Sequence, residues 1–217
     1  MNSLHSEASP AALATLLQGS TQIWRGRELA RTDARTTGYA ALDARLPGGG
    51  WPVGALIEIA PACDGLGELR VTMPALKAWC TEGRTVAFVD PPYTPYAPAL
   101  TRFGIPLTSF LWITATRDDD ARWATEQLLR EGAAAVLLWS AVKEDRALRR
   151  LQLAAEAGRA CAFLYRSPQM LSNASPAALR LFLSPQDGGI RVDLKKVKGG
   201  HTGGVTVPLP AIPSVPA

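Results

Sequence analysis

The chain has 217 residues, of which 47% are hydrophobic and 19% are charged, and its formal net charge is +4. This composition predicts a globular domain with a full core. The sequence contains no run of about 18 apolar residues, so no membrane-spanning helix is predicted. A small positive charge does not by itself indicate a nucleic-acid-binding protein, because such proteins gather Lys and Arg on one face.

Cysteine and histidine are too few and too scattered to predict a metal site or a catalytic triad. Cys63, Cys80 and Cys161 form no C-x-x-C pair, and His5 and His201 lie in polar or glycine-rich end segments. The pattern predicts no disulfide framework, no zinc site and no His-based catalysis. No cofactor is expected. The first residues do not form a signal peptide, so the protein is expected in the cytoplasm.

The N-terminal stretch reads as an arm joined to a larger core. Ser9 and Pro10 are typical of the first turn of a helix, which is predicted over 11–18. A basic linker that contains Trp24 follows. The expected parts are an N-terminal helix and linker at 1–35, a core domain at 36–208 and a flexible proline-rich tail at 209–217.

Buried strands and helices alternate along the core. Apolar runs predict strands at 55–59, 85–90, 110–114, 135–139 and 161–165. Helices are predicted after Leu69 and over 99–103, 118–131 and 145–158. Short alternating strands at 179–183, 190–196 and 205–208 are typical of antiparallel hairpins. The sequence therefore predicts an α/β fold: a mainly parallel twisted sheet with helices on both faces and antiparallel edge strands near the C-terminus.

The stretch 36–69 reads as a turn, a short helix, a glycine loop, a buried strand and a second glycine loop that opens a helix. In nucleotide-binding α/β proteins a strand, a glycine loop and a helix hold a phosphate. A working P-loop ends in Lys and Ser or Thr, whereas Glu68 and Leu69 stand at those places. A carboxylate there repels a triphosphate. The degenerate positions are Cys63, Asp64, Gly65, Leu66, Gly67, Glu68 and Leu69.

Two further strand ends lack the acids of an ATPase. The fourth strand ends in Trp139 and Ser140, where a metal-binding acid is needed. The second strand ends in Asp90, but prolines occupy the place of a water-activating glutamate. These departures argue against ATP hydrolysis, so no catalytic residue is expected. A strand–turn–helix that never held a nucleotide is the alternative.

Pro74 falls inside the helix that follows the loop. A proline has no N–H and so removes one helical hydrogen bond. The helix is therefore expected either to start late, near Thr72, or to be kinked.

Several motifs resemble a known family. Thr37-Gly38, Leu42-Asp43, Gly48-Gly49-Gly50, Gly54 and Ile57-Glu58-Ile59 resemble the start of the ATPase core of RecA recombinases. Six blocks in order resemble the ImuA family, RecA-like accessory proteins of bacterial mutagenic translesion synthesis. The blocks are IWRG at 23–26, LPGGGWP at 46–52, GLGEL at 65–69, PPYTPYAPAL at 91–100, LRRLQLAA at 148–155 and SPAALRL at 175–181.

The resemblance implies a RecA-like P-loop NTPase fold with a degenerate nucleotide site. It also implies a non-catalytic adaptor of SOS-induced mutagenic translesion DNA synthesis. Its partners would be RecA, an ImuB-like inactive Y-family polymerase homologue and, indirectly, an error-prone DnaE-type polymerase. A SulA-type cell-division inhibitor and an ATP-binding RecA-like module remain alternatives. In the ATP-binding alternative Tyr96 stacks on adenine, but we expect Tyr93 and Tyr96 to pack the proline loop onto the core.

Direct DNA binding is expected to be weak or absent. The segments that match the DNA-binding loops of RecA are short, at 143–146 and 167–178. A solvated basic face is the favoured interpretation of the basic side chains near them. The residues that could contact a partner or DNA are Arg149, Arg150, Arg166, Lys195, Lys196 and Lys198.

Overall fold

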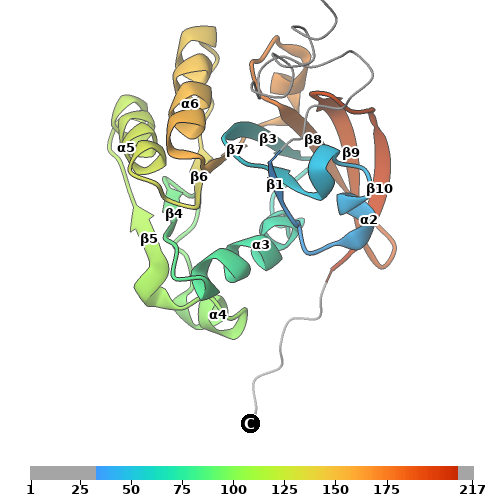
Figure 1. Cartoon of the computed structure of the whole chain (residues 1–217), viewed down its shortest axis with the longest axis horizontal. Helices are drawn as coiled ribbons and strands as arrows, with labels where there is room; N and C mark the ends of the chain where they lie inside the picture. The colour runs from blue at the N-terminus through green and yellow to red at the C-terminus, as the bar shows by residue number, and fades with distance from the viewer. Residues whose placement is uncertain (1–32, 210–217) are drawn as a thin grey trace, which may run out of the picture. The chain divides into compact units, whose positions relative to one another are not determined.

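The computed structural model describes residues 33–209 (Figure 1). The helix expected at 11–18, the block at 23–26 and most of the tail lie outside this range. Within it, two short strands pair antiparallel just before the main sheet, Arg35 of β1 opposite Trp51 of β2. Their bounds are β1 (Ala34–Arg35) and β2 (Trp51–Pro52).

One eight-stranded sheet organises the molecule, with the order β10-β9-β8-β3-β7-β6-β4-β5. The strands from β3 to β8 run parallel, β9 is antiparallel to β8, and β10 is antiparallel to β9. The predicted mainly parallel sheet with an antiparallel edge is therefore confirmed. The bounds are β3 (Ala55–Pro61), β4 (Val86–Val89), β5 (Phe110–Ile113), β6 (Ala135–Trp139), β7 (Cys161–Tyr165), β8 (Leu179–Gln186), β9 (Gly189–Val197) and β10 (Gly203–Pro208).

Helices cover both faces of the sheet (Figure 1). On one face α3 and α4 pack against the sheet through Leu76 and Leu100, and on the other α5 and α6 pack through Leu129 and Leu151. The helices are α2 (Ala40–Asp43), α3 (Leu69–Thr81), α4 (Ala97–Arg102), α5 (Asp118–Arg130) and α6 (Asp145–Gly158). Three short 3-10 helices are η1 (Pro47–Gly49), η2 (Leu107–Ser109) and η3 (Pro168–Ser172).

The two faces follow from the alternation of side chains along each strand. In β3, Ile57 and Ile59 face α3, whereas Leu56 faces the layer that contains α6. All three are at most 1% exposed. Burying each such side chain stabilises the fold by roughly 1.5–3 kcal/mol.

The helix α3 accommodates its proline with the help of Tyr39, which lies just before α2. The helix starts at Leu69 and continues through Pro74, so the expectation of a late start near Thr72 is wrong. Pro74 offers no N–H to the carbonyl of Arg70, and the Tyr39 hydroxyl donates to that oxygen instead, at 2.7 Å. Gly38 lets the chain pass closely, because a Cβ there would lie 2.3 Å from the Pro74 Cβ.

Candidate functional site

The degenerate loop, residues 62–68, lies where the sheet order changes direction. It leaves the end of β3, and β3 is hydrogen-bonded to β7 on one side and to β8 on the other. In open α/β sheets, ligands bind at such a point, outside the carboxyl ends of the strands. The loop that the sequence singles out therefore follows an inner strand of the sheet.

Two glycines shape the loop. Gly65 and Gly67 have φ of +73° and +85°, the left-handed region that other residues rarely adopt. The carbonyl of Gly67 accepts a hydrogen bond from the N–H of Arg70 at 2.8 Å, which closes the first turn of α3. A strand, a loop with two left-handed glycines and a helix thus follow one another here.

Aromatic side chains end the neighbouring strands on the α3 face. Trp139 at the end of β6 stacks on Tyr165 at the end of β7, with ring centroids 4.8 Å apart and planes 11° from parallel. The Tyr165 hydroxyl lies 3.2 Å from Oγ1 of Thr72 in α3. The strand β6 therefore ends in an aromatic ring and not in a carboxylate.

Glu68 adds a negative charge to this cluster. The pKa of Tyr165 is raised chiefly by burial, and the charge of Glu68 raises it further. The Oε2 atom of Glu68 and the Nε atom of Arg70 are both buried without a hydrogen-bond partner. The carboxylate thus lies beside the aromatic stack, where it disfavours an anion such as a phosphate.

The loop after β4 differs from one sequence expectation. Tyr93 and Tyr96 are 70% and 67% exposed, so the interpretation that they pack the proline loop onto the core is wrong. Asp90, which ends the strand, has φ of +53°, and its N–H donates to the Ile113 carbonyl at 2.8 Å.

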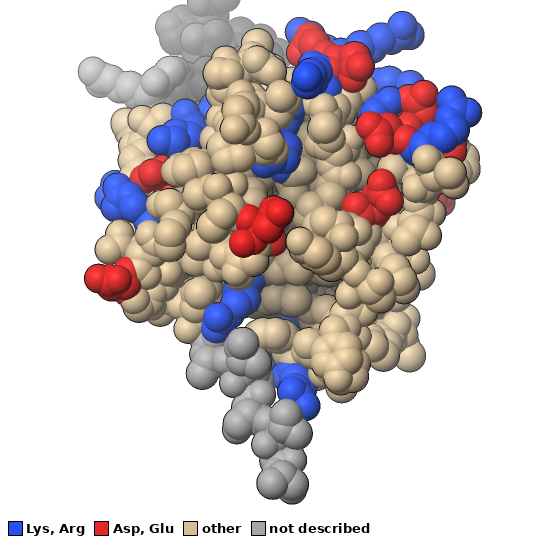
Figure 2. Space-filling model, turned by 180° about the vertical axis from the view of Figure 1, so that it is seen from behind, with Lys and Arg blue, Asp and Glu red and all other residues tan. Residues whose placement is uncertain are grey.

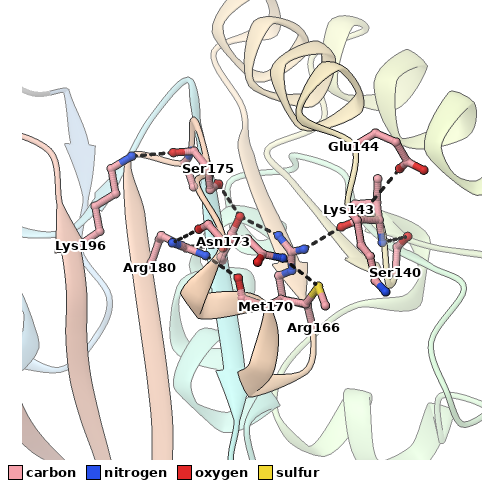
Figure 3. A network of polar contacts seen from close by, with 12 residues as sticks. Ser140, Lys143, Glu144, Arg166, Met170, Asn173, Ser175, Arg180 and Lys196 are labelled. Atoms are coloured by element: carbon pink, nitrogen blue, oxygen red, sulfur yellow. Dashed lines mark hydrogen bonds and ion pairs between the residues drawn. The ribbon is translucent and has the colours of Figure 1, made fainter.

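A buried charge network lies at the same end of the sheet, on the opposite face (Figure 3). Glu58 of β3 is fully buried and accepts hydrogen bonds from Arg166 at 2.9 Å and from Arg180 at 2.7 Å. Ser175 donates to the same carboxylate at 2.5 Å. One carboxylate therefore binds two guanidinium groups, one from the residue that follows β7 and one from β8.

The same two arginines also donate hydrogen bonds to backbone carbonyls of the neighbouring loops. Arg166 donates to the Val142 carbonyl at 2.6 Å, in the loop that joins β6 to α6. Arg180 donates to the carbonyls of Asn173 and Met170 at 2.8 and 2.9 Å, in the segment that joins β7 to β8. The loop between β6 and α6 and the segment between β7 and β8 are thus both tied to Glu58 through these arginines.

Two of the proposed contact residues belong to this network. Arg166 has a side chain that is only 1% exposed, so it does not present its charge to a partner. Lys196 donates to the Ser175 carbonyl at 2.8 Å, and burial, helped by the charge of Arg180, lowers its pKa. The sequence analysis did not identify the role of Glu58. Its position as a lone acid in an apolar strand was the signal that could have indicated a buried, paired charge.

The remaining basic residues are exposed but mostly paired. Arg149 donates to Asp145 at 2.8 Å, and Arg150 donates to the buried Glu126 at 2.9 Å. On β9, Lys195 lies over the Phe182 ring, whereas Lys198 is exposed beyond the strand end. Figure 2 shows basic side chains interspersed with acidic and uncharged ones on the face in view.

Chemical groups for metal binding do not gather in the described part of the chain. Among residues 33–209 there is no group of three or more His, Cys, Asp or Glu side chains that could hold a metal ion. None of the helices in that range is both long and apolar enough to cross a membrane.

A scan of the sequence against models of known protein families finds no match.

Proposed function

We propose that this chain is a non-catalytic adaptor of SOS-induced mutagenic translesion DNA synthesis, similar to the ImuA family. The observation that carries the proposal is the loop between β3 and α3. It keeps the backbone shape of a phosphate-binding element, with Gly65 and Gly67 in left-handed conformations, while Glu68 replaces the lysine. This combination is what we expect of a RecA-like core that keeps its backbone shape but no longer binds or hydrolyses a nucleotide.

Two features oppose ATP hydrolysis at this loop. Phosphate binding needs backbone N–H groups and a cation, and hydrolysis needs a metal held by a hydroxyl and an acid. Glu68 brings a carboxylate to the loop, and its charge already raises the pKa of the neighbouring Tyr165, a shift caused chiefly by burial. Trp139 stacks on Tyr165 in the place of the metal-binding acid. The protein is therefore proposed to work by contact rather than by catalysis.

The sheet supports a RecA-like core. Its first long strand, β3, lies inside the sheet, and two strands at the C-terminal side, β9 and β10, form an antiparallel extension. Together with the sequence blocks, this arrangement supports RecA and an ImuB-like inactive polymerase homologue as partners in the cytoplasm. An error-prone DnaE-type polymerase would associate through them.

Capture experiments test the partners. The tagged chain is mixed with purified RecA or with the ImuB-like homologue, with and without ATP, and retained protein is quantified. We expect both partners to be retained. Retention of a tubulin-like division protein in place of RecA would support a SulA-type inhibitor and contradict the proposal.

Turnover tests the absence of catalysis. ATP hydrolysis is measured with Mg²⁺ and single-stranded DNA, and RecA serves as the active control. We expect the chain to release phosphate no faster than buffer. Stimulated release that follows the chain through purification would overturn a non-catalytic role.

A further inference from the structure

The segment that joins β4 to α4 carries the two most exposed aromatic side chains of the described part of the chain. Residues 91–98, with the sequence PPYTPYAP, are called the proline loop. Its Tyr93 and Tyr96 are 70% and 67% exposed, and Pro92, Ala97 and Pro98 beside them are exposed as well. Exposed apolar side chains that occur singly need no explanation, whereas a contiguous group of them marks an interaction surface. The proline loop is therefore a candidate contact for another molecule.

Both ends of the proline loop are fixed to the core. Just before it, the N–H of Asp90 donates to the Ile113 carbonyl at 2.8 Å. At its other end the Tyr96 carbonyl accepts from the N–H groups of Ala99 and Leu100 at 2.9 and 3.2 Å, which starts α4. The side chain of Leu100 is only 4% exposed and packs into the core. The exposed tyrosines thus extend from a loop whose two ends are held in place.

Prolines restrict the backbone between these ends. Four of the eight residues of the proline loop are proline, at 91, 92, 95 and 98, and each fixes its own φ. Thr94 precedes a proline, which narrows its conformations too. A tyrosine side chain has only two torsions to fix on binding. Binding through this loop would therefore cost little conformational entropy.

The charge of the loop decides which kind of partner it fits. No residue from 91 to 101 is charged, Asp90 precedes this stretch, and Arg102 follows it. Aromatic side chains that stack on the bases of single-stranded nucleic acid are accompanied by a basic groove for the phosphates. The proline loop has no such groove within its own sequence. A protein surface without charge is the better match, and proline-rich segments dock into grooves lined by aromatic side chains.

We propose that the proline loop is a protein-docking element of this chain. Tyr93 and Tyr96 insert into an uncharged groove, lined by aromatic and aliphatic side chains, on one of the two proposed partner proteins. The identity of the partner rests on the proposed adaptor function. The docking element leaves the same end of the sheet as the degenerate glycine loop, but β7 and β6 lie between the two strands that lead into them. It therefore acts without any nucleotide at that loop.

Calorimetric titration tests the docking element, with purified RecA and the purified ImuB-like homologue as probes. For the partner that holds the loop, we expect Tyr93→Ser combined with Tyr96→Ser to raise the dissociation constant at least about tenfold. Trp123→Ser is the matched control, because it removes an aromatic side chain that is 61% exposed on α5 and should leave binding unchanged. Circular dichroism verifies that each variant is folded.

A further variant separates the stiffness of the loop from its side chains. Pro95→Ala keeps both tyrosines and frees the backbone between them. We expect it to weaken binding less than the double tyrosine variant does, because only the entropic cost of ordering the loop increases.

Nitration of tyrosine locates the contact. The chain has four tyrosines, and Tyr39 and Tyr165 are buried, at 8% and 3% exposed. Tetranitromethane should therefore modify only Tyr93 and Tyr96 in the free chain, and the partner should protect both. Peptide mass spectrometry reads the sites.

The outcomes separate this proposal from the adaptor function. A wild-type chain that binds neither protein would overturn both. A partner that binds the double tyrosine variant as tightly as the wild type, or that leaves nitration unchanged, would overturn the docking element alone. So would a double variant that loses binding to single-stranded DNA but keeps its binding to both proteins, because the tyrosines would then stack on bases.

Discussion

The hydroxyl of Tyr39 supplies a hydrogen bond that α3 cannot make for itself, because Pro74 has no N–H. We expect Tyr39→Phe to reduce the free energy of unfolding by about 1–3 kcal/mol, since the Arg70 carbonyl loses the donor at 2.7 Å. Urea denaturation measures this change.

A double-mutant cycle separates the hydrogen bond from general packing. Pro74→Ala returns a helical N–H to the Arg70 carbonyl, so Tyr39→Phe should cost clearly less in that background. An equal cost in both backgrounds would mean that the hydroxyl acts in some other way.

The three cysteines differ in exposure, which predicts their reactivity. Cys63 is exposed, whereas Cys80 and Cys161 are buried, and burial raises the pKa of Cys161 to about 12. We expect iodoacetamide at pH 8 to modify Cys63 alone in the folded protein and all three in urea, because the thiolate is the reactive form. Peptide mass spectrometry identifies the sites.

The same shift links stability to pH. The Cys161 thiol ionises near 9.0 when unfolded and near 12 when folded. Below pH 9 its contribution to stability is fully present, and it decreases as the pH rises from 9 toward 12. Rapid modification of Cys161 in the folded protein at pH 8 would contradict this account of its burial.

At the scale of elements, Glu58 ties β3 to β7, β8 and two loops. We expect Glu58→Gln to reduce the free energy of unfolding by about 3–5 kcal/mol, because two buried arginines lose their counter-charge. Limited proteolysis should also cut more readily within 140–144 and 166–178.

An exposed ion pair provides the control for Glu58. Asp145→Asn removes the partner of Arg149 on the surface of α6, and it should change stability by less than about 1 kcal/mol. Similar losses for the two variants would show that the buried network contributes no more than a surface pair.

The glycine loop and α3 form the second element under test. We expect Glu68→Lys combined with Leu69→Thr to remain without ATP turnover, because Trp139 stays stacked on Tyr165 and Pro92 still follows the end of β4. Phosphate release with Mg²⁺ and single-stranded DNA measures this. Turnover in the double variant would mean that the two residues alone account for the lost activity.

Periodicity in the sequence was enough to predict most of the elements. Apolar runs placed β3, β4, β6 and β7 to within two residues at each end, and alternation placed the antiparallel edge. These signals are local, and burial on one or both faces imposes them directly. The outer position of β5 was not predicted, because its sequence is as apolar as that of a central strand.

The buried network could not be predicted because its parts are far apart in the chain. Glu58 is 108 positions from Arg166 and 122 from Arg180. Composition therefore made Arg166 look like a surface charge. Tyr93 and Tyr96 were expected to be buried as aromatics, yet the proline-rich loop leaves them exposed.

For the whole molecule, the central claim is that a phosphate-loop shape persists without nucleotide binding. The melting temperature of the chain with increasing ATP and Mg²⁺ tests it most directly, because any ligand that binds the folded state stabilises it by mass action. We predict no change at millimolar ATP, while RecA is stabilised under the same conditions. A saturable rise of several degrees for this chain would contradict the account.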